Sequence, residues 1–273
     1  MCRHLAYLGP PTRLSALVLE PAHGLLRQSY APLDMRGGGT VNADGFGVGW
    51  YAGGDPVRYR SAAPLWSDGV FADLARVTTA AAVLAAVRSA TVGMPVTGAA
   101  AAPFAEGRFL FSHNGVVRGW PSSVAPLAAA LPVTDLLTLD APTDAALLWA
   151  LVRDRLRAGK DPADALADVV AEVAAAAPGS RLNLLLTDGT AVWATTWDHA
   201  LSVRSGPGHV LVASEPLDDD PAWSHALSVR VAPGQVLVAS EPLDADPGWT
   251  GVPDRHLVVA RPGEHHLIPL GSS

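Results

Sequence analysis

The cysteine at position 2 has the most distinctive chemistry in this sequence, and it is the only cysteine of the 273 residues. An initiator methionine is normally removed when the next side chain is small, so we expect the mature chain to begin with Cys2. A free thiol and a free α-amine ordinarily have pKa values of about 8.5 and 7.7–8. The amine can therefore take the thiol proton and produce a nucleophilic thiolate. The alternative is that Cys2 is merely a small apolar residue at the end of a strand.

Two later segments carry groups suited to an amide substrate. Arg88 ends an apolar stretch and is followed by Thr91, and an arginine there can hold a carboxylate through two parallel hydrogen bonds. In Phe111–Val116, the Asn114 side-chain amide and the Gly115 backbone N–H can form an oxyanion hole. Taken singly, these segments also fit a surface arginine and an Asn-Gly turn.

Two more segments are ambiguous in the same way. Thr143-Asp144 opens a long helix, where the Asp144 carboxylate can bind an ammonium group or serve as an ordinary first-turn acid. The glycines of Asn42–Trp50 permit a tight turn and a close backbone approach before a strand. No GK[ST] follows, so this segment is not a phosphate-binding loop.

In this order, the segments resemble class II glutamine amidotransferase domains of the N-terminal-nucleophile hydrolase superfamily. The family pattern is an amino-terminal Cys, Arg-x-x-Thr-x-Gly, His-Asn-Gly, and Thr-Asp opening a helix. The longer strings MCRHLAYLGPP, MRGGGTVNADGFGVGWY and LVASEPLD resemble the amidohydrolases of ergothioneine biosynthesis. That resemblance implies hydrolysis of γ-glutamyl-hercynylcysteine S-oxide to glutamate and hercynylcysteine S-oxide, with no cofactor and no metal.

The resemblance also implies roles for individual residues. Cys2 is the nucleophile, and Asn114 and Gly115 stabilise the oxyanion. Arg88, assisted by Thr91, binds the glutamyl carboxylate, and Asp144 binds its ammonium group. The sequence departs from many glutamine-using relatives at Val92, where they have His, and at Ala146, where they often have an acid.

The sequence leaves two alternatives to this hydrolase function. One is a glutaminase subunit that supplies ammonia to a separate synthase, and the other is a catalytically inactive binding module. Recognition of the rest of the substrate is also open. The trimethylammonium group of a hercynyl substrate can be held by aromatic faces, for which the candidates are Trp50, Tyr51, Trp66 and Trp120.

The elements that must position these residues follow from the hydrophobic pattern. We expect strands at Arg3–Leu8, Phe46–Tyr51, Ala81–Arg88, Phe109–His113, Leu182–Thr187, Val192–Thr196, His256–Ala260 and His265–Ile268. Helices are expected at Pro121–Leu131, from Asp144 to about Ala158, and from Asp161-Pro162 to about Ala177. Strands, then helices, then strands predict an α+β fold, and the resemblance makes it a four-layer αββα sandwich of two mostly antiparallel sheets.

The chain is expected to form a single domain that contains a duplication. Residues 199–224 recur at 225–250 with 20 of 26 positions identical, and each copy reads as a β-hairpin. Insertion of a whole hairpin leaves the following chain at the same position and in the same direction. We therefore expect one copy to be dispensable.

Composition narrows the class of protein further. Charged residues make up 16%, and the net charge is −7 with no dense Lys/Arg run, which argues against nucleic-acid binding. Neither a secretory signal nor an apolar run of about 18 residues is present, so we expect a cytoplasmic protein that does not contact a membrane. The sequence leaves the oligomeric state open.

Overall fold

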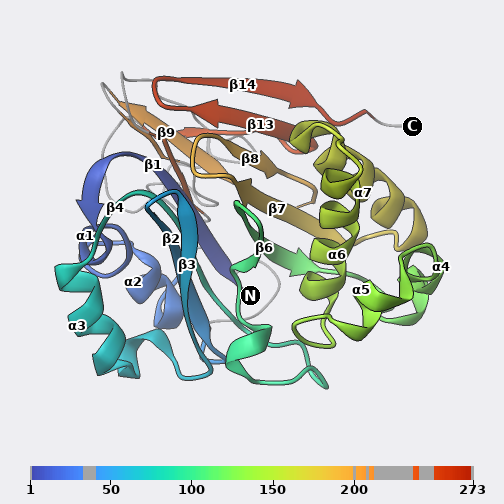
Figure 1. The fold of residues 1–273 in the computed structure, drawn as a ribbon, viewed down its shortest axis with the longest axis horizontal. Helices are drawn as coiled ribbons and strands as arrows, with labels where there is room; N and C mark the ends of the chain where they lie inside the picture. Colours follow the sequence, from blue (N-terminus) through green and yellow to red (C-terminus); the bar gives the residue numbers. More distant parts are fainter. Residues whose placement is uncertain are drawn as a thin grey trace.

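The computed structural model describes residues 2–32, 41–198, 201–206, 209–211, 236–239 and 249–271. They form a four-layer α-β-β-α sandwich, in which α1 to α3 cover one sheet and α6 and α7 cover the other (Figure 1). The predicted α+β sandwich is therefore confirmed. No helix among these residues has the length and apolarity needed to span a membrane.

The first sheet has the strand order β10-β9-β11-β1-β4-β2-β3 in the described part of the chain, with β12 also pairing with β9. Its strands pair in antiparallel fashion, and β1 pairs with both β4 and β11. The strands are β1 (Arg3–Arg13), β2 (Phe46–Ala52), β3 (Asp55–Ser61), β4 (Thr79–Val87), β9 (Ser202–Gly206), β10 (His209–Leu211), β11 (Val236–Ala239) and β12 (Trp249–Gly251).

The second sheet has the order β14-β13-β8-β7-β6-β5 and is also antiparallel. The predicted turn at Asp188-Gly189 joins β7 to β8, where the Asp188 carboxylate accepts hydrogen bonds from the two residues after the glycine. The strands are β5 (Phe104–Glu106), β6 (Phe109–Val116), β7 (Arg181–Thr187), β8 (Val192–Thr195), β13 (His256–Arg261) and β14 (Glu264–Pro269).

Two long helices cover the second sheet, and each begins at a side-chain cap. Thr143 accepts a hydrogen bond from the Ala146 N–H at 3.2 Å, and Asp161 accepts one from the Ala163 N–H at 2.8 Å. The helices are α1 (Leu14–Val18), α2 (Leu25–Tyr30), α3 (Gly69–Val77), α4 (Ala125–Ala129), α5 (Val133–Leu137), α6 (Asp144–Arg157) and α7 (Pro162–Ala176).

One predicted helix, Pro121–Leu131, is wrong in extent. A 3₁₀ turn at Ser122–Val124 precedes the short α4. Pro126 explains the difference, because inside a longer helix it would lack a backbone donor and clash with the carbonyl four residues earlier. At the second position of α4 it causes neither problem.

Three apolar clusters separate the layers, and they define which way each strand residue faces. Leu110 of β6 packs between the two sheets, whereas Phe111 packs on the helical side and stacks on Trp149 at 5.3 Å. Alternation along the strand then directs Ser112 and Asn114 toward the first sheet. A contact of 3.1 Å between Ser112 Oγ and His4 Nδ1 of β1 agrees with this assignment.

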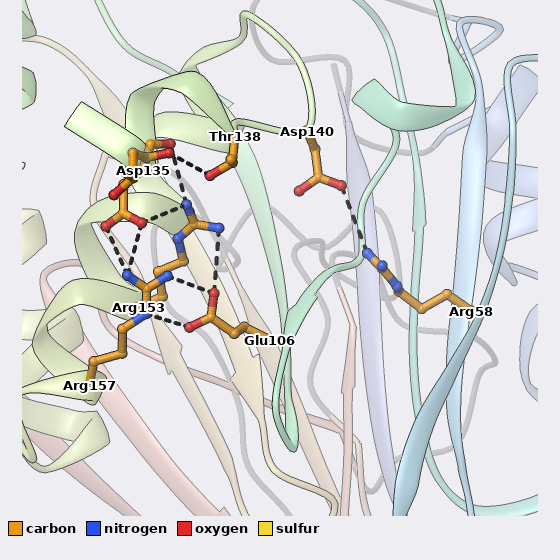
Figure 2. Close-up of polar contacts among 8 residues, drawn as sticks. Arg58, Glu106, Asp135, Thr138, Asp140, Arg153 and Arg157 are labelled. Carbon is orange, nitrogen blue, oxygen red and sulfur yellow. Dashed lines mark hydrogen bonds and ion pairs between the residues drawn. The ribbon is translucent and has the colours of Figure 1, made fainter. Parts of the chain in front are cut away.

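An ion-pair network ties α5 and α6 to β5, as Figure 2 shows. The Asp135 carboxylate, whose side chain is only 6% exposed, accepts hydrogen bonds from Arg157 at 2.9 Å and from Arg153 at 3.3 Å. Both arginines also reach Glu106. The hydrogen bonds from Arg157 hold the pKa of Glu106 below its usual value. Asp140 pairs separately with Arg60 at 2.9 Å.

The duplicated segment is only partly described. In the first copy, β9 and β10 pair in antiparallel fashion. In the second copy, β11 lies between β9 and β1. Most of residues 199–250 lie outside the described residues, so the division into one domain with a dispensable copy stays a prediction.

Candidate active site

A pocket opens where β1 begins, β4 and β6 end, and α6 begins. It brings together residues that lie more than 140 positions apart in the sequence. Five of the six predicted site residues line it: Cys2, Arg88, Thr91, Gly115 and Asp144. The other lining residues are Ala86, Val87, Ser89, Met94, Ala100, Ala102, Phe104, Ser112, His113, Thr143 and Ala145.

Cys2 lies at the pocket wall as a free, half-buried thiol. Its Sγ atom donates to the Ser89 carbonyl oxygen at a distance of 3.6 Å. The Cys2 carbonyl accepts a hydrogen bond from the buried Arg3 guanidinium at 3.1 Å. These contacts hold the residue on both sides and leave its sulfur at the surface of the pocket.

Arg88 lies directly after β4 and is a buried cation, with 8% of its surface exposed. Its guanidinium donates to the Pro95 carbonyl oxygen at 2.8 Å. Among the described residues, no carboxylate oxygen lies within 4.0 Å of it. A buried guanidinium without a counter-ion in a pocket is suited to bind the carboxylate of a ligand.

Asp44 holds the segment that carries Arg88. Its carboxylate accepts a hydrogen bond from the Ala90 N–H at 2.7 Å, and its backbone N–H donates to the Arg88 carbonyl at 3.0 Å. The Arg88 N–H donates in turn to the carbonyl of Gly45, whose φ of +111° confirms the tight turn expected there. Asp44 therefore acts as a positioning residue for Arg88 and Ser89.

The end of β6 carries Asn114 and Gly115, the two residues predicted as oxyanion donors. Asn114 is fully buried and faces the space between the sheets, although it does not line the pocket itself. Gly115 does line it, with a φ of +144° that places its backbone against the Arg181 carbonyl of β7. The same carbonyl accepts a hydrogen bond from His113 Nε2 at 3.1 Å. Burial lowers the pKa of His113 below its usual value.

The first turn of α6 forms the opposite wall. The Asp144 carboxylate accepts hydrogen bonds from the Val117 N–H at 3.1 Å and the Ala145 N–H at 2.8 Å. No cationic side chain pairs with it among the described residues. The pocket therefore holds a thiol, an unpaired cation and an unpaired anion.

A family model for class II glutamine amidotransferases matches residues 19–271 of the chain. The chain is also 42% identical over 272 residues to a gamma-glutamyl-hercynylcysteine sulfoxide hydrolase of Mycolicibacterium smegmatis, covering 99% of this chain and 100% of the relative. The chain belongs to the class II glutamine amidotransferases. A second hydrolase of the same name, from Mycobacterium tuberculosis, is 43% identical over 81% of this chain and 87% of its own length.

Solved structures of the family share the fold. One is a glutamine aminotransferase class-II domain protein from Silicibacter pomeroyi, with a TM-score of 0.64 and 21% identity over 99% of this chain and all of the other. Another is a glutamine phosphoribosylpyrophosphate amidotransferase from B. subtilis, with a TM-score of 0.65 and 12% identity over all of this chain and 50% of the other. At these identities the likeness concerns the fold alone.

Two residues of the site were not predicted from the sequence, and four predicted aromatic residues lie outside the pocket lining. His113 and Asp44 lie inside the motifs but received no role, because their partners belong to distant segments. The four aromatic candidates do not line the pocket. The Tyr51 hydroxyl, for example, donates to the carbonyls of Arg108 and Thr187.

Proposed function

We propose that this chain hydrolyses the γ-glutamyl amide bond of γ-glutamyl-hercynylcysteine S-oxide. The products are glutamate and hercynylcysteine S-oxide. The observation that carries the proposal is that Arg88 and Asp144, neither of which has an ion-pair partner among the described residues, share a pocket with Cys2. The chain also matches a gamma-glutamyl-hercynylcysteine sulfoxide hydrolase over that relative's full length. The charges complement the α-carboxylate and α-ammonium groups of a glutamyl residue.

The proposed mechanism uses Cys2 twice. Its α-amine takes the thiol proton, and the sulfur attacks the γ-carbonyl carbon. The N–H of Gly115 and the side-chain amide of Asn114 stabilise the negative oxygen of the tetrahedral intermediate. The C–N bond then breaks and the leaving amine accepts the proton. Water cleaves the resulting thioester, which releases glutamate and restores the thiol.

The remaining roles concern the glutamyl end. Arg88 binds the α-carboxylate with Thr91 beside it, and Asp144 binds the ammonium. Val92 is fully exposed to solvent, and Ala146 only supplies a capping N–H, so neither extends these contacts. No step needs a metal or cofactor. Thiols are kept reduced in the cytosol, so a free thiol nucleophile is compatible with the proposed cytoplasmic location.

The test compares two substrates on the purified protein, γ-glutamyl-hercynylcysteine S-oxide and L-glutamine. We expect efficient cleavage of the first, weak cleavage of the second, and loss of both activities in Cys2→Ala. Mass spectrometry of the intact protein should show that Met1 has been removed. Efficient glutamine hydrolysis without cleavage of the sulfoxide would instead identify a glutaminase, and retention of Met1 in active protein would exclude the amine as the base.

A further inference from the structure

Two arginines lie just beyond the oxyanion donors and have no role in the chemistry described so far. Arg181 is the first residue of β7, and its Cα pairs with that of Val116 in β6. Arg118 follows two residues after Val116, and its Nε donates to the Gly179 carbonyl at 3.4 Å. Gly115, which lines the pocket, directly precedes Val116.

The direction of the Arg181 side chain follows from the alternation along β7. Leu182 and Leu184 pack on the helical side of the sheet, whereas Leu185 packs between the sheets. Arg181 therefore extends toward the first sheet, on the same face as Asn114. That face also receives β1, whose His4 contacts Ser112 and whose beginning carries Cys2 (Figure 1).

Neither arginine has an acidic partner. Among the described residues, no carboxylate oxygen lies within 4.0 Å of either guanidinium. The Arg181 Nε atom is buried and has no hydrogen-bond acceptor. Burial and the nearby charge of Arg118 lower the pKa of Arg181. Two adjacent cations, one with a buried and unsatisfied donor, are stabilised when an anion binds between them.

Most other arginines of the second sheet and its helices are paired. Arg153, Arg155 and Arg157 all contact carboxylates, and so does Arg108. Arg88, which is proposed to bind the glutamyl carboxylate, resembles Arg181 in this respect. Both guanidinium groups are removed from solvent at least in part, and neither has a carboxylate partner among the described residues. Arg88 follows β4 of one sheet and lines the pocket, whereas Arg181 opens β7 of the other sheet and pairs with Val116, the residue after pocket-lining Gly115.

We propose that Arg181, assisted by Arg118, binds a carboxylate of the amine that leaves when the γ-glutamyl amide is cleaved. This inference rests on the proposed hydrolysis. In a γ-glutamyl peptide, the residue after the scissile bond carries an α-carboxylate one carbon away from the amide nitrogen. Such a carboxylate lies next to the reacting carbonyl, on the side away from Arg88.

As a consequence, the enzyme should bind glutamine more weakly than a γ-glutamyl amide of an amino acid. Glutamine releases ammonia, which has no carboxylate, so it gains nothing from Arg181. A γ-glutamyl amide of an amino acid gains a charge-assisted hydrogen bond. Loss of such a bond corresponds to about 10- to 100-fold in binding.

The experiment uses Arg181→Gln and Arg118→Gln with two substrates, γ-glutamyl-hercynylcysteine S-oxide and γ-glutamyl-4-nitroanilide, whose leaving group has no carboxylate. We expect Arg181→Gln to raise the KM for the sulfoxide about 10- to 100-fold and to leave kcat/KM for the anilide within about twofold. Arg118→Gln should act in the same direction with a smaller effect. Arg76→Gln, which removes an exposed arginine paired with Asp73, is the matched control.

Equal losses on both substrates, or no change on either, would overturn the assignment. A second measurement needs no variant: the unmodified enzyme should prefer γ-glutamyl-S-methylcysteine over its C-terminal carboxamide by at least about tenfold. Equal rates on this pair would also overturn it. Failure of the proposed function gives a different result, because the unmodified enzyme would then leave the sulfoxide uncleaved.

Discussion

Replacing Gly115 with alanine tests the geometry of the oxyanion site most directly. A Cβ atom at this position would lie 1.9 Å from the Arg181 carbonyl oxygen and 2.7 Å from His113 Nε2, whereas ordinary contacts begin near 3.4 Å. The Arg181 oxygen belongs to the neighbouring strand and cannot retreat without disturbing the β6–β7 pairing. The variant must therefore displace the Gly115 backbone, and its N–H, by about 1 Å or more.

The expected effect on catalysis is large. A misplacement of about 1 Å can cost about 10²-fold, and loss of one oxyanion donor about 10²–10³ in kcat. We therefore expect kcat to fall by about 10²–10³ for Gly115→Ala. The φ of +144° adds a stability cost of about 1–3 kcal/mol.

Two other glycines separate the effect of steric overlap from the effect of the backbone conformation. Gly159 has a φ of +82°, and a Cβ atom added there would meet no atom within 4 Å, so Gly159→Ala incurs only the conformational cost. Gly69 has open space and no positive φ, so Gly69→Ala at the start of α3 should leave the rate unchanged and should not destabilise the protein. The assay is release of 4-nitroaniline from the γ-glutamyl anilide, together with urea unfolding. A folded Gly115→Ala enzyme with a kcat within about fivefold of the original would refute the reasoning.

Three further predictions concern other parts of the molecule. Asp44→Ala should raise KM about tenfold by freeing the Ala90 N–H, whereas Asp44→Asn keeps an acceptor oxygen and should stay near normal; equal effects in steady-state kinetics would contradict this. Asp135→Ala should lower the free energy of unfolding in urea by about 3 kcal/mol, because it removes the closer carboxylate of buried Arg153 and leaves it only Glu106 at 3.6 Å, whereas Asp73→Ala at an exposed pair should cost under about 1 kcal/mol. Deletion of residues 225–250 removes β11, but the identical VLVA sequence at 210–213 is available to pair with β1 in its place, so we expect a folded protein with unchanged kcat; failure to fold would exclude a dispensable copy.

The elements that the sequence predicted well have strong local signals. Thr143 and Asp161 cap α6 and α7, and Asp188-Gly189 turns β7 into β8. The helices that it missed are short. The five-residue α1 begins at Leu14, and Arg13 before it provides no side-chain cap, so nothing local distinguishes the helix from an extended segment. For α3 a signal was present, because Asp68 caps it through the Phe71 N–H.

The site required more than local signals. Arg88, Asn114 and Asp144 each fit an ordinary structural role in their own segment, and only the resemblance grouped them. The contribution of Asp44 depends on a hydrogen bond to Ala90, 46 positions away, which no local pattern encodes. Arg181 looks like a surface residue in the sequence, and only the pairing of β7 with β6 places it beside Gly115.

The alternation along β6 has a practical consequence for protein preparations. Asn114 and His113 are neighbours that face opposite sides of one sheet, so a slip of one residue against β7 would exchange their environments. A molecule in such a register lacks the proposed oxyanion site. The amount of the proposed thioester formed in the first turnover, divided by total protein, therefore measures the fraction of correctly paired molecules.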